Sequence, residues 1–339
     1  MKDSAYYQKS LLFRFRTQTE RKDLFKKNNR VLIACSGGPD SVALFHLVRL
    51  SFPDLKIGLV HFNHGLRPRT AKRDELFVKN LAKRFAVSFF CGHANLSRKS
   101  ERKKLSIEEA ARARRYAFFK TAYKKSKARA ILFAHHLDDQ AETVLMRVCQ
   151  GTGLRGLLGI RDQMVMDRMR VVRPLLSFSK VELLQFLEEN HFLSCHDETN
   201  HATDFLRNRL RLEVLPYLAK KVNPRILSAL ARIPEIIRDE NDFIAEKESE
   251  AAKKVIVIAS SAKVILKASL FRGLHPALQF RILDGALKRM DPAAGLLFET
   301  GLLIQKSLKN KVFRLSLPRG VELSGNARLI LLQKSPLKS

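Results

Sequence analysis

A glycine-rich loop that carries hydroxyl and carboxyl groups offers the clearest chemistry in this chain. Ser36-Gly37-Gly38-Pro39-Asp40-Ser41 lies between the apolar run Val31–Cys35 and the helix-like Val42–Val48. Paired glycines let backbone N–H groups approach a phosphate, and the following helix N-terminus adds partial positive charge. The Gly-Lys-Ser/Thr ending of kinase-type loops is absent, and Asp40 suggests an intervening Mg²⁺. The alternative is a glycine turn in which Asp40 caps the helix.

A histidine- and acid-rich segment offers a second reactive group. His135–Thr143 follows the apolar run Ala130–Ala134 and contains Asp138, Asp139 and Glu142. One of the two aspartates would begin a helix, with Glu142 one turn later. Carboxylates beside a phosphate loop could hold Mg²⁺ or orient a cationic substrate. The alternative is N-capping, with acid placed favourably at the positive end of the helix.

Basic residues form three further groups. His61–Arg67 ends a candidate strand, so Asn63 could contact a base or ribose and Arg67 a phosphate. Arg112 and Arg115 lie three residues apart, on one side of a helix, and Arg207–Arg211 forms another cluster. Guanidinium groups suit phosphate. For either arginine cluster alone, a solvated basic face is the more common explanation.

Alternating strands and helices would position these groups. Candidate strands separated by helix-length segments are Val31–Cys35, Ile57–Phe62, Val87–Phe90, Ala130–Ala134 and Val171–Leu175. Their order predicts a parallel sheet covered on both faces, with ligands at the carboxyl ends of the strands. The three polar motifs follow candidate strands directly. Ser106–Glu109 and Ser179–Glu182 fit the capping box that starts a helix.

A smaller second module is expected after a boundary near Leu215–Pro224. Its pattern indicates an α+β arrangement without a catalytic signature. The expected helices are Ile226–Lys247 with an interruption at Pro234, Leu270–Met290 and Leu296–Leu308, and the expected strands are Val255–Ile258, Phe313–Leu317 and Val321–Leu323.

The charge balance favours a polyanionic partner. The 339 residues include 63 Lys and Arg against 33 Asp and Glu, a formal net charge of +30. Nucleic acid fits this excess, with an anionic membrane surface as the rival. No apolar run has the length of a membrane span, and the charged start predicts a cytoplasmic protein. Cysteines 35, 91, 149 and 195 are widely spaced and are expected to be reduced thiols.

Taken in order, these motifs resemble the tRNA(Ile)-lysidine synthetases, within the PP-loop ATP pyrophosphatases. The resemblance covers Arg30 to Leu218. The matching segments are Ser36–Ser41, His61–Arg67, Ala111–Tyr116, His135–Thr143, Gly151–Gly153, Gly156-Leu157, Arg173–Leu175, Asp197–Asn200 and Arg207–Arg211. The resemblance implies an α/β fold: an N-terminal parallel-sheet PP-loop ATPase domain, similar to adenine nucleotide α-hydrolases, then a smaller helical or α+β C-terminal domain. The expected bounds are a basic extension over 1–29, the catalytic domain over 30–217, and a helical linker with a tRNA-binding domain over 218–339.

The resemblance also implies a reaction. ATP would adenylate the C2 oxygen of the wobble cytidine in the CAU anticodon of tRNA(Ile), and the side-chain amine of free lysine would then displace AMP. The implied site residues are Asp40, Arg112, Asp139 and Arg207 for catalysis; Ser36, Gly37, Gly38, Pro39, Asp40, Ser41, His61 and Asn63 for ATP; Arg115, Asp138 and Glu142 for lysine or the intermediate; Arg67 and Arg211 for tRNA; and Asp40 and Asp139 for Mg²⁺.

Three other functions compete with this one. A PP-loop enzyme that thiolates tRNA usually needs cysteine pairs, which the spacing here disfavours. A small-molecule amide-forming ligase does not explain the charge. A non-catalytic basic RNA-binding protein explains the charge, but not Asp40 and the acidic segment beside an anion loop. The sequence leaves open whether the chain forms a homodimer.

Overall fold

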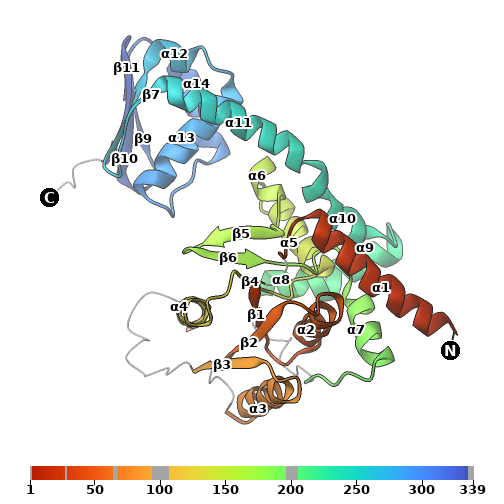
Figure 1. The fold of residues 1–339 in the computed structure, drawn as a ribbon. Coiled ribbons are helices and arrows are strands. Elements are labelled where there is room, and N and C mark those ends of the chain that lie inside the picture. Colours follow the sequence, from red (N-terminus) through yellow and green to blue (C-terminus); the bar gives the residue numbers. More distant parts are fainter. Residues whose placement is uncertain (1, 27–28, 64–67, 94–106, 196–204, 335–339) are drawn as a thin grey trace. The chain divides into compact units, whose positions relative to one another are not determined.

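The chain folds into two compact units, Met1–Glu235 and Ile236–Ser339. The computed structural model describes residues 2–26, 29–63, 68–93, 107–195 and 205–334. Figure 1 shows the course of the chain through both units. The functional bounds predicted at 29/30 and 217/218 stay predictions, because the boundary between the two compact units lies at 235/236.

The first unit is built on a six-stranded sheet in the order β3-β2-β1-β4-β6-β5. Five strands run parallel, as the sequence predicts, and β5 pairs antiparallel with β6. The strands are β1 (Arg30–Ala34), β2 (Lys56–Asn63), β3 (Ser88–His93), β4 (Ala130–Leu132), β5 (Gln163–Met166) and β6 (Met169–Val172). The sequence did not reveal β5, because it is a short edge strand whose side chains are mostly exposed.

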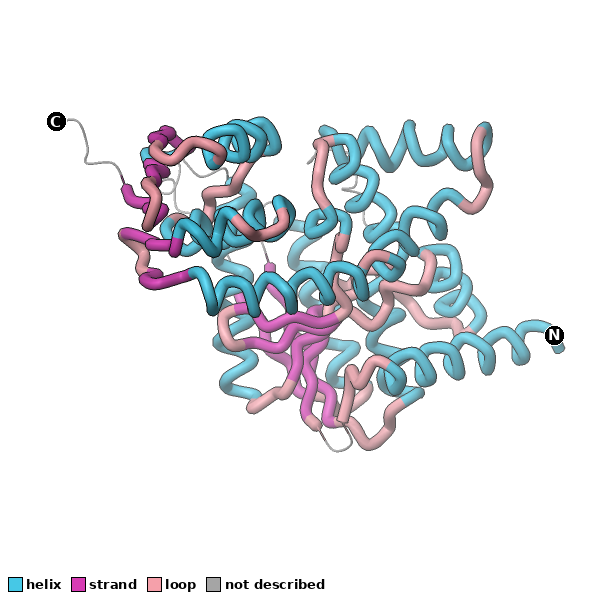
Figure 2. The backbone as a smooth tube through the Cα atoms, turned by 90° about the horizontal axis from the view of Figure 1, so that it is seen from above, coloured by secondary structure: helices cyan, strands magenta, loops and turns pink. Residues whose placement is uncertain are grey.

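Helices cover both faces of this sheet (Figures 1 and 2). The helices up to the unit boundary are α1 (Lys2–Arg21), α2 (Pro39–Ser51), α3 (Pro68–Arg84), α4 (Ile107–Ser126), α5 (Leu137–Cys149), α6 (Leu154–Leu157), α7 (Lys180–Glu189), α8 (Phe205–Arg209), a π-helical turn (Leu210–Val214), α9 (Leu215–Lys221) and α10 (Ile226–Ile236). Along β1, Val31 and Ile33 join the core beneath α2, whereas Leu32 joins the core on the opposite face. This alternation follows from the two-residue period of a strand.

Residues near the chain start belong to the core of the first unit. Leu11 and Phe15 of α1 are fully buried, and the ring of Phe15 packs against Phe52 and Phe178. Full burial of side chains of this size contributes about 2 kcal/mol each. The segment that was expected as a basic extension therefore packs on the sheet domain.

One of the two predicted capping boxes can be compared with the structure. At α7, the backbone N–H of Glu182 donates to Ser179 Oγ at 3.3 Å, and the Glu182 carboxylate accepts from the Ser179 backbone N–H at 2.8 Å. This capping box is confirmed. Ser106 lies outside the described residues, while α4 is described from Ile107 onward.

The second unit has a five-stranded antiparallel sheet in the order β7-β8-β11-β10-β9. Its elements are α11 (Arg238–Val255), β7 (Ile256–Ala259), β8 (Lys263–Lys267), α12 (Ala268–Arg272), α13 (Pro276–Met290), α14 (Phe298–Leu308), β9 (Phe313–Leu317), β10 (Val321–Gly325) and β11 (Leu329–Lys334). The α+β prediction is confirmed. The single helix expected over 270–290 is wrong, because α12 ends at Arg272 and Pro276 begins a separate helix, α13. The interruption expected at Pro234 lies at Ile237 instead, between α10 and α11.

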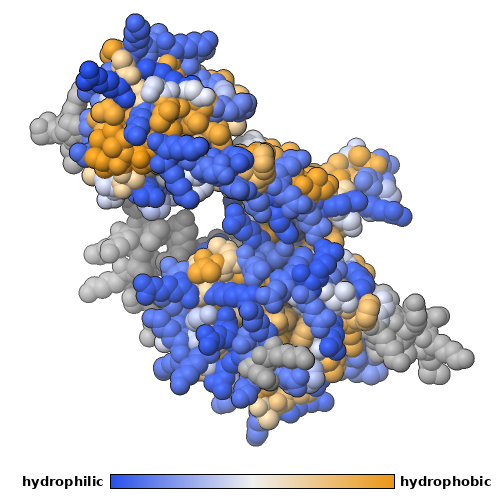
Figure 3. All heavy atoms as spheres, turned by 45° about the horizontal axis from the view of Figure 1, so that its top comes forward, coloured by the Kyte–Doolittle hydropathy of each residue, from blue (hydrophilic) through white to orange (hydrophobic). Residues whose placement is uncertain are grey.

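The surface is dominated by hydrophilic residues on the face in view, with apolar residues in smaller groups (Figure 3). Among the described helices, none combines the length and apolar character needed to cross a membrane.

Candidate active site at the carboxyl edge of the parallel sheet

The glycine loop connects β1 to α2 at the carboxyl end of β1. Gly37 has φ +95°, a left-handed conformation that favours glycine. Ser41 Oγ donates to the carbonyl of Gly38 at 2.9 Å and accepts from the Ser36 backbone N–H at 3.2 Å. These hydroxyl contacts fix the loop. Gly38 is the N-cap of α2, so Asp40 lies in the first turn and does not cap the helix.

Two neighbouring glycines give a matched test of the loop. Gly37→Ala should destabilise the loop by about 1–2 kcal/mol and weaken ATP binding about tenfold or more, because an alanine at φ +95° is strained. Gly38→Ala is the control, since Gly38 has φ −69° and an added Cβ would meet only Ser36 Oγ at 3.4 Å. Isothermal titration with ATP measures both. Equal affinities for the two variants would contradict a phosphate-binding role for this loop conformation.

Three carboxylates converge on one buried imidazole. His136 Nε2 lies 3.6 Å from both Asp40 Oδ2 and Asp139 Oδ2, and His136 Nδ1 lies 3.4 Å from Asp138 Oδ2. The His136 side chain is 4% exposed. Since β1 and β4 are neighbours in the sheet, the glycine loop after β1 lies beside the segment after β4, and the His136–Asp40 contact connects the two.

The two adjacent histidines have opposite charge states. Burial alone lowers the pKa of an imidazole, but the surrounding carboxylates of Asp138, Asp40 and Asp139 outweigh burial and raise the pKa of His136 to about 10. Burial lowers the pKa of His135 to about 4, with the cations of Arg173 and Arg207 opposing the pull of Asp139. At neutral pH, His136 is therefore an imidazolium and His135 is neutral.

The raised pKa of His136 predicts a pH dependence of stability. A group whose pKa rises on folding contributes stability fully below its ordinary value of 6.5, and that stability is lost as the pH rises toward about 10. Relative to His136→Gln, the free energy of unfolding should fall by up to about 1.4 kcal/mol per pH unit between about pH 7 and pH 8.5. Urea unfolding at several pH values measures this slope. Parallel profiles for the two proteins would contradict the assignment.

Asp138 and Asp139 also stabilise the starts of helices. The backbone N–H of Lys180, at the start of α7, donates to Asp138 Oδ2 at 2.9 Å. Burial raises the pKa of a carboxyl group, but His136 and this N–H outweigh burial and lower the pKa of Asp138. Asp139 likewise accepts the His136 backbone N–H at 3.0 Å, which is the capping alternative for this segment. Asp139 therefore both caps α5 and faces the site.

Arginines of α8 and the π-helical turn complete the acidic cluster. Arg207 donates from Nε to Glu142 Oε2 at 2.8 Å and from its second terminal nitrogen to Asp139 Oδ1 at 3.0 Å. Arg211 Nε lies 3.5 Å from Glu142 Oε1. Glu142 is 3% exposed, so both oxygens of a buried carboxylate face guanidinium groups. The geometry unites the sequence-predicted Asp139, Glu142, Arg207 and Arg211 in one network.

A second arginine group surrounds Tyr116. The guanidinium carbons of Arg112 and Arg115 lie 5.6 Å and 5.7 Å from the centre of its ring. Burial lowers the pKa of Arg115 and of Arg173, and Arg112 acts electrostatically on both. Arg173, at the end of β6, also acts on His135, which links this group to the acidic cluster. These cations suit polyphosphate.

The remaining predicted ATP contacts lie at the carboxyl end of β2. His61 is buried, with Nδ1 2.9 Å from the Cys35 carbonyl, and burial lowers its pKa. Asn63 donates to Glu75 Oε2 at 2.9 Å, so in this structure its amide contacts α3. Arg67 and Asp197–Asn200 lie outside the described residues.

A divalent cation fits this edge of the sheet. Asp40 Oδ1 is buried and has no hydrogen-bond partner among the described residues. An unsatisfied carboxylate oxygen at a helix start beside an anion loop is a suitable Mg²⁺ ligand, with phosphate and water supplying the other oxygens.

Sequence reasoning missed two residues of the site. His136 and Arg173 lay in the recognised motifs, but neither received a role. Two consecutive histidines directly before two aspartates were the available signal for His136. Only the folded structure shows that His136 lies among the carboxylates.

A glycine loop at the carboxyl end of the first strand of a parallel sheet, beside acidic and arginine clusters, defines a nucleotide-binding α/β protein. The chain belongs to the PP-loop domain family, whose model matches residues 12–218.

The chain is also similar to individual proteins of known name. The chain is 34% identical over 271 residues to a tRNA(Ile)-lysidine synthase of Clostridioides difficile, covering 79% of this chain and 58% of the relative. It is 35% identical over 266 residues to a tRNA(Ile)-lysidine synthase of Geobacter sulfurreducens, covering 78% and 56%. The chain therefore spans little more than half the length of these relatives.

A solved structure supports the fold. The U34-tRNA thiolase NcsA of Methanococcus maripaludis, determined with its [4Fe-4S] cluster, superposes with a TM-score of 0.55 at 18% identity. The match covers 68% of this chain and 80% of the thiolase chain. At this identity the similarity concerns the fold alone.

Proposed function

We propose that this protein uses ATP to ligate lysine to C2 of the wobble cytidine in the CAU anticodon of tRNA(Ile), giving lysidine, AMP and pyrophosphate. The observation that carries the proposal is the network joining Asp40 of the glycine loop to His136, Asp139 and Arg207. The names of the relatives support the same reaction. The excess positive charge suits a tRNA backbone.

The proposed first step is adenylation of the cytidine. The C2 oxygen is a poor leaving group. It would attack the α-phosphate of ATP, the bond from that phosphorus to pyrophosphate would break, and the oxygen would then carry an adenylyl group that departs readily as AMP. The N–H groups of the glycine loop and the N-terminus of α2 would hold the phosphates, and Arg112 and Arg207 would balance the charge that develops. Mg²⁺ held by Asp40 and Asp139 would neutralise phosphate charge. The wobble base lies in a single-stranded loop and can enter a pocket at low cost.

The proposed second step is attack by lysine. Its side-chain amine must lose a proton before it attacks C2 and expels AMP. Asp139, whose carboxylate Arg207 and the His136 backbone N–H hold in place, would position the lysine amine for this attack, and solvent would take the proton. Arg115, Asp138 and Glu142 would shape the lysine or intermediate site, and Arg211 would contact tRNA. We expect the reaction to use free lysine and to take place in the cytoplasm. Whether the chain forms a homodimer stays an open prediction.

A transfer assay tests the proposal. Purified protein is incubated with ATP, labelled lysine and a tRNA(Ile) transcript, and the control transcript has uridine at the wobble position. We expect label in the first tRNA only, with one AMP released per lysine transferred. Binding of tRNA without AMP release would favour a non-catalytic RNA-binding protein, and incorporation of sulfur from a sulfur donor would favour a thiolase.

A further inference from the structure

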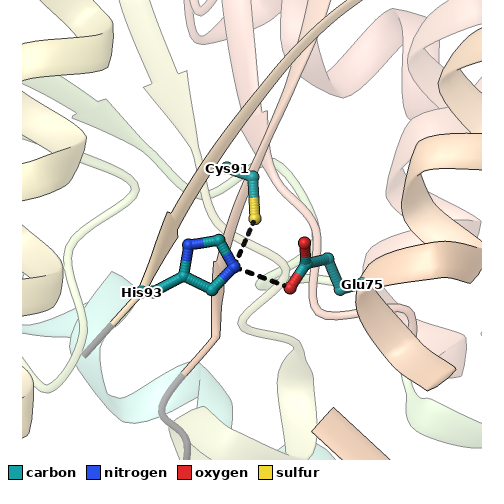
Figure 4. A group of neighbouring side chains, drawn as sticks. All are labelled: Glu75, Cys91 and His93. Atoms are coloured by element: carbon teal, nitrogen blue, oxygen red, sulfur yellow. Dashed lines mark hydrogen bonds and ion pairs between the residues drawn. The ribbon is translucent and has the colours of Figure 1, made fainter. Parts of the chain in front are cut away.

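Three side chains of different chemistry meet outside the acidic network. Glu75 of α3 and Cys91 and His93 of β3 bring a carboxylate oxygen, a thiol sulfur and an imidazole nitrogen within 4.8 Å of one another (Figure 4). His93 Nε2 lies 2.9 Å from Glu75 Oε2 and 3.9 Å from Cys91 Sγ. In the described part of the chain, this is the only such group of three.

The local structure explains why they meet. Cys91 and His93 are two residues apart on one strand, so both side chains point to the same face of the sheet. α3 packs against that face and supplies Glu75. Asn63, the register partner of His93 on β2, donates to Glu75 Oε2 at 2.9 Å. An amide that holds a carboxylate in place is the outer-shell support that metal ligands commonly have.

We propose that Glu75, Cys91 and His93 form a binding site for a Zn²⁺ ion with a fourth coordination position open to solvent. Tetrahedral zinc with bonds of about 2.0 Å to nitrogen and oxygen and about 2.3 Å to sulfur needs ligand atoms roughly 3.3–3.6 Å apart. The distances from His93 Nε2, 2.9 Å to Glu75 and 3.9 Å to Cys91, bracket this range, and the Glu75 and Cys91 ligand atoms lie within 4.8 Å of each other, so side-chain adjustments of up to about an ångström would form the site.

The chemistry of the three ligands selects the ion. A thiolate and an imidazole favour zinc over Mg²⁺ or Ca²⁺, which prefer oxygen. Binding would release the thiol proton to solvent. The His93 side chain is 60% exposed, which provides entry and leaves room for water at the fourth position. The site neighbours His61 and Asn63 across the β2–β3 register, yet it does not depend on the proposed ligase reaction.

Cobalt titration tests the site in the full-length, tag-free, metal-free protein. We expect one equivalent of Co²⁺ to give tetrahedral visible bands and a thiolate-to-cobalt charge-transfer band, both displaced by Zn²⁺. Cys91→Ser should abolish the charge-transfer band and weaken binding more than about tenfold, because even the loss of an outer-shell partner costs 10–100-fold. Cys149→Ser, which removes an exposed thiol elsewhere, should leave the spectrum unchanged.

A second variant separates ligand loss from misfolding. His93→Gln alters an exposed strand-end side chain, so its far-UV circular dichroism should match that of the unaltered protein. It should keep the thiolate band and bind Co²⁺ at least about tenfold more weakly. Absence of a thiolate band in the unaltered protein, or a band that survives Cys91→Ser, would overturn the proposal.

Discussion

Asp139→Asn should reduce the rate of lysine transfer to tRNA(Ile) by about 10²–10³-fold at saturating ATP, the loss typical of a site deprived of one preorganised charged group. Asparagine can still accept the His136 backbone N–H, so the start of α5 should persist. Asparagine has no negative charge with which to hold a cation or the lysine amine beside Asp40. Quenched-flow measurement of labelled lysine in tRNA gives the rate.

The matched control is Asp167→Asn, at the turn between β5 and β6. Asp167 has φ +50°, a conformation that asparagine tolerates well, and its side chain is 72% exposed. This variant should react at the rate of the unaltered protein. If Asp139→Asn also reacted at that rate, the role assigned to Asp139 would be wrong.

Arg207→Gln should impair both stability and catalysis. The change leaves Glu142, a 3%-exposed carboxylate, with only Arg211 at 3.5 Å among the ion pairs described for it. Removing one partner of a buried ion pair costs about 3–5 kcal/mol, and the 35% exposure of Arg207 reduces our expectation to about 2 kcal/mol. Lysine transfer should fall by at least about 10²-fold. Urea unfolding and the transfer assay measure the two effects.

A double variant separates the structural role of Arg207 from its chemical role. Arg207→Gln with Glu142→Gln removes the buried charge that the single variant leaves with only the longer Arg211 contact, so stability should recover by about 1 kcal/mol or more relative to Arg207→Gln alone. Lysine transfer should not recover, because the charge beside Asp139 stays absent and Glu142 itself belongs to the proposed lysine site. Joint recovery of stability and rate would show that Arg207 acts only by supporting the fold.

The sequence predicted what depends on local pattern. Apolar runs ending at the glycine loop and at His135 placed both motifs at the carboxyl edge of a parallel sheet, and the structure confirms this edge. α5 begins at Leu137, so Asp138 and Asp139 lie in its first turn, close to the predicted helix start. Edge strand β5 escaped prediction because its exposed side chains carry no burial signal.

What escaped prediction depends on long-range contact. Arg207 and Glu142 are 65 residues apart, and no local pattern shows that they pair. The pKa of His136 is raised by its sequence neighbours Asp138 and Asp139, but also by Asp40, which the fold brings from α2 to within 3.6 Å. The meeting of Glu75 with Cys91 and His93 likewise depends on how α3 packs on β3. These are tertiary effects, in which the fold sets the charge state or the partner of each residue.

Trapping the adenylated tRNA tests the central claim most directly. The protein is mixed with ATP radiolabelled at the α-phosphate and with tRNA(Ile), first without lysine. The account predicts that label becomes attached to the tRNA through the wobble cytidine and that added lysine releases it as AMP. If no label entered the tRNA in the absence of lysine, although the same protein transferred lysine to that tRNA once lysine was added, an adenylated cytidine intermediate would be contradicted.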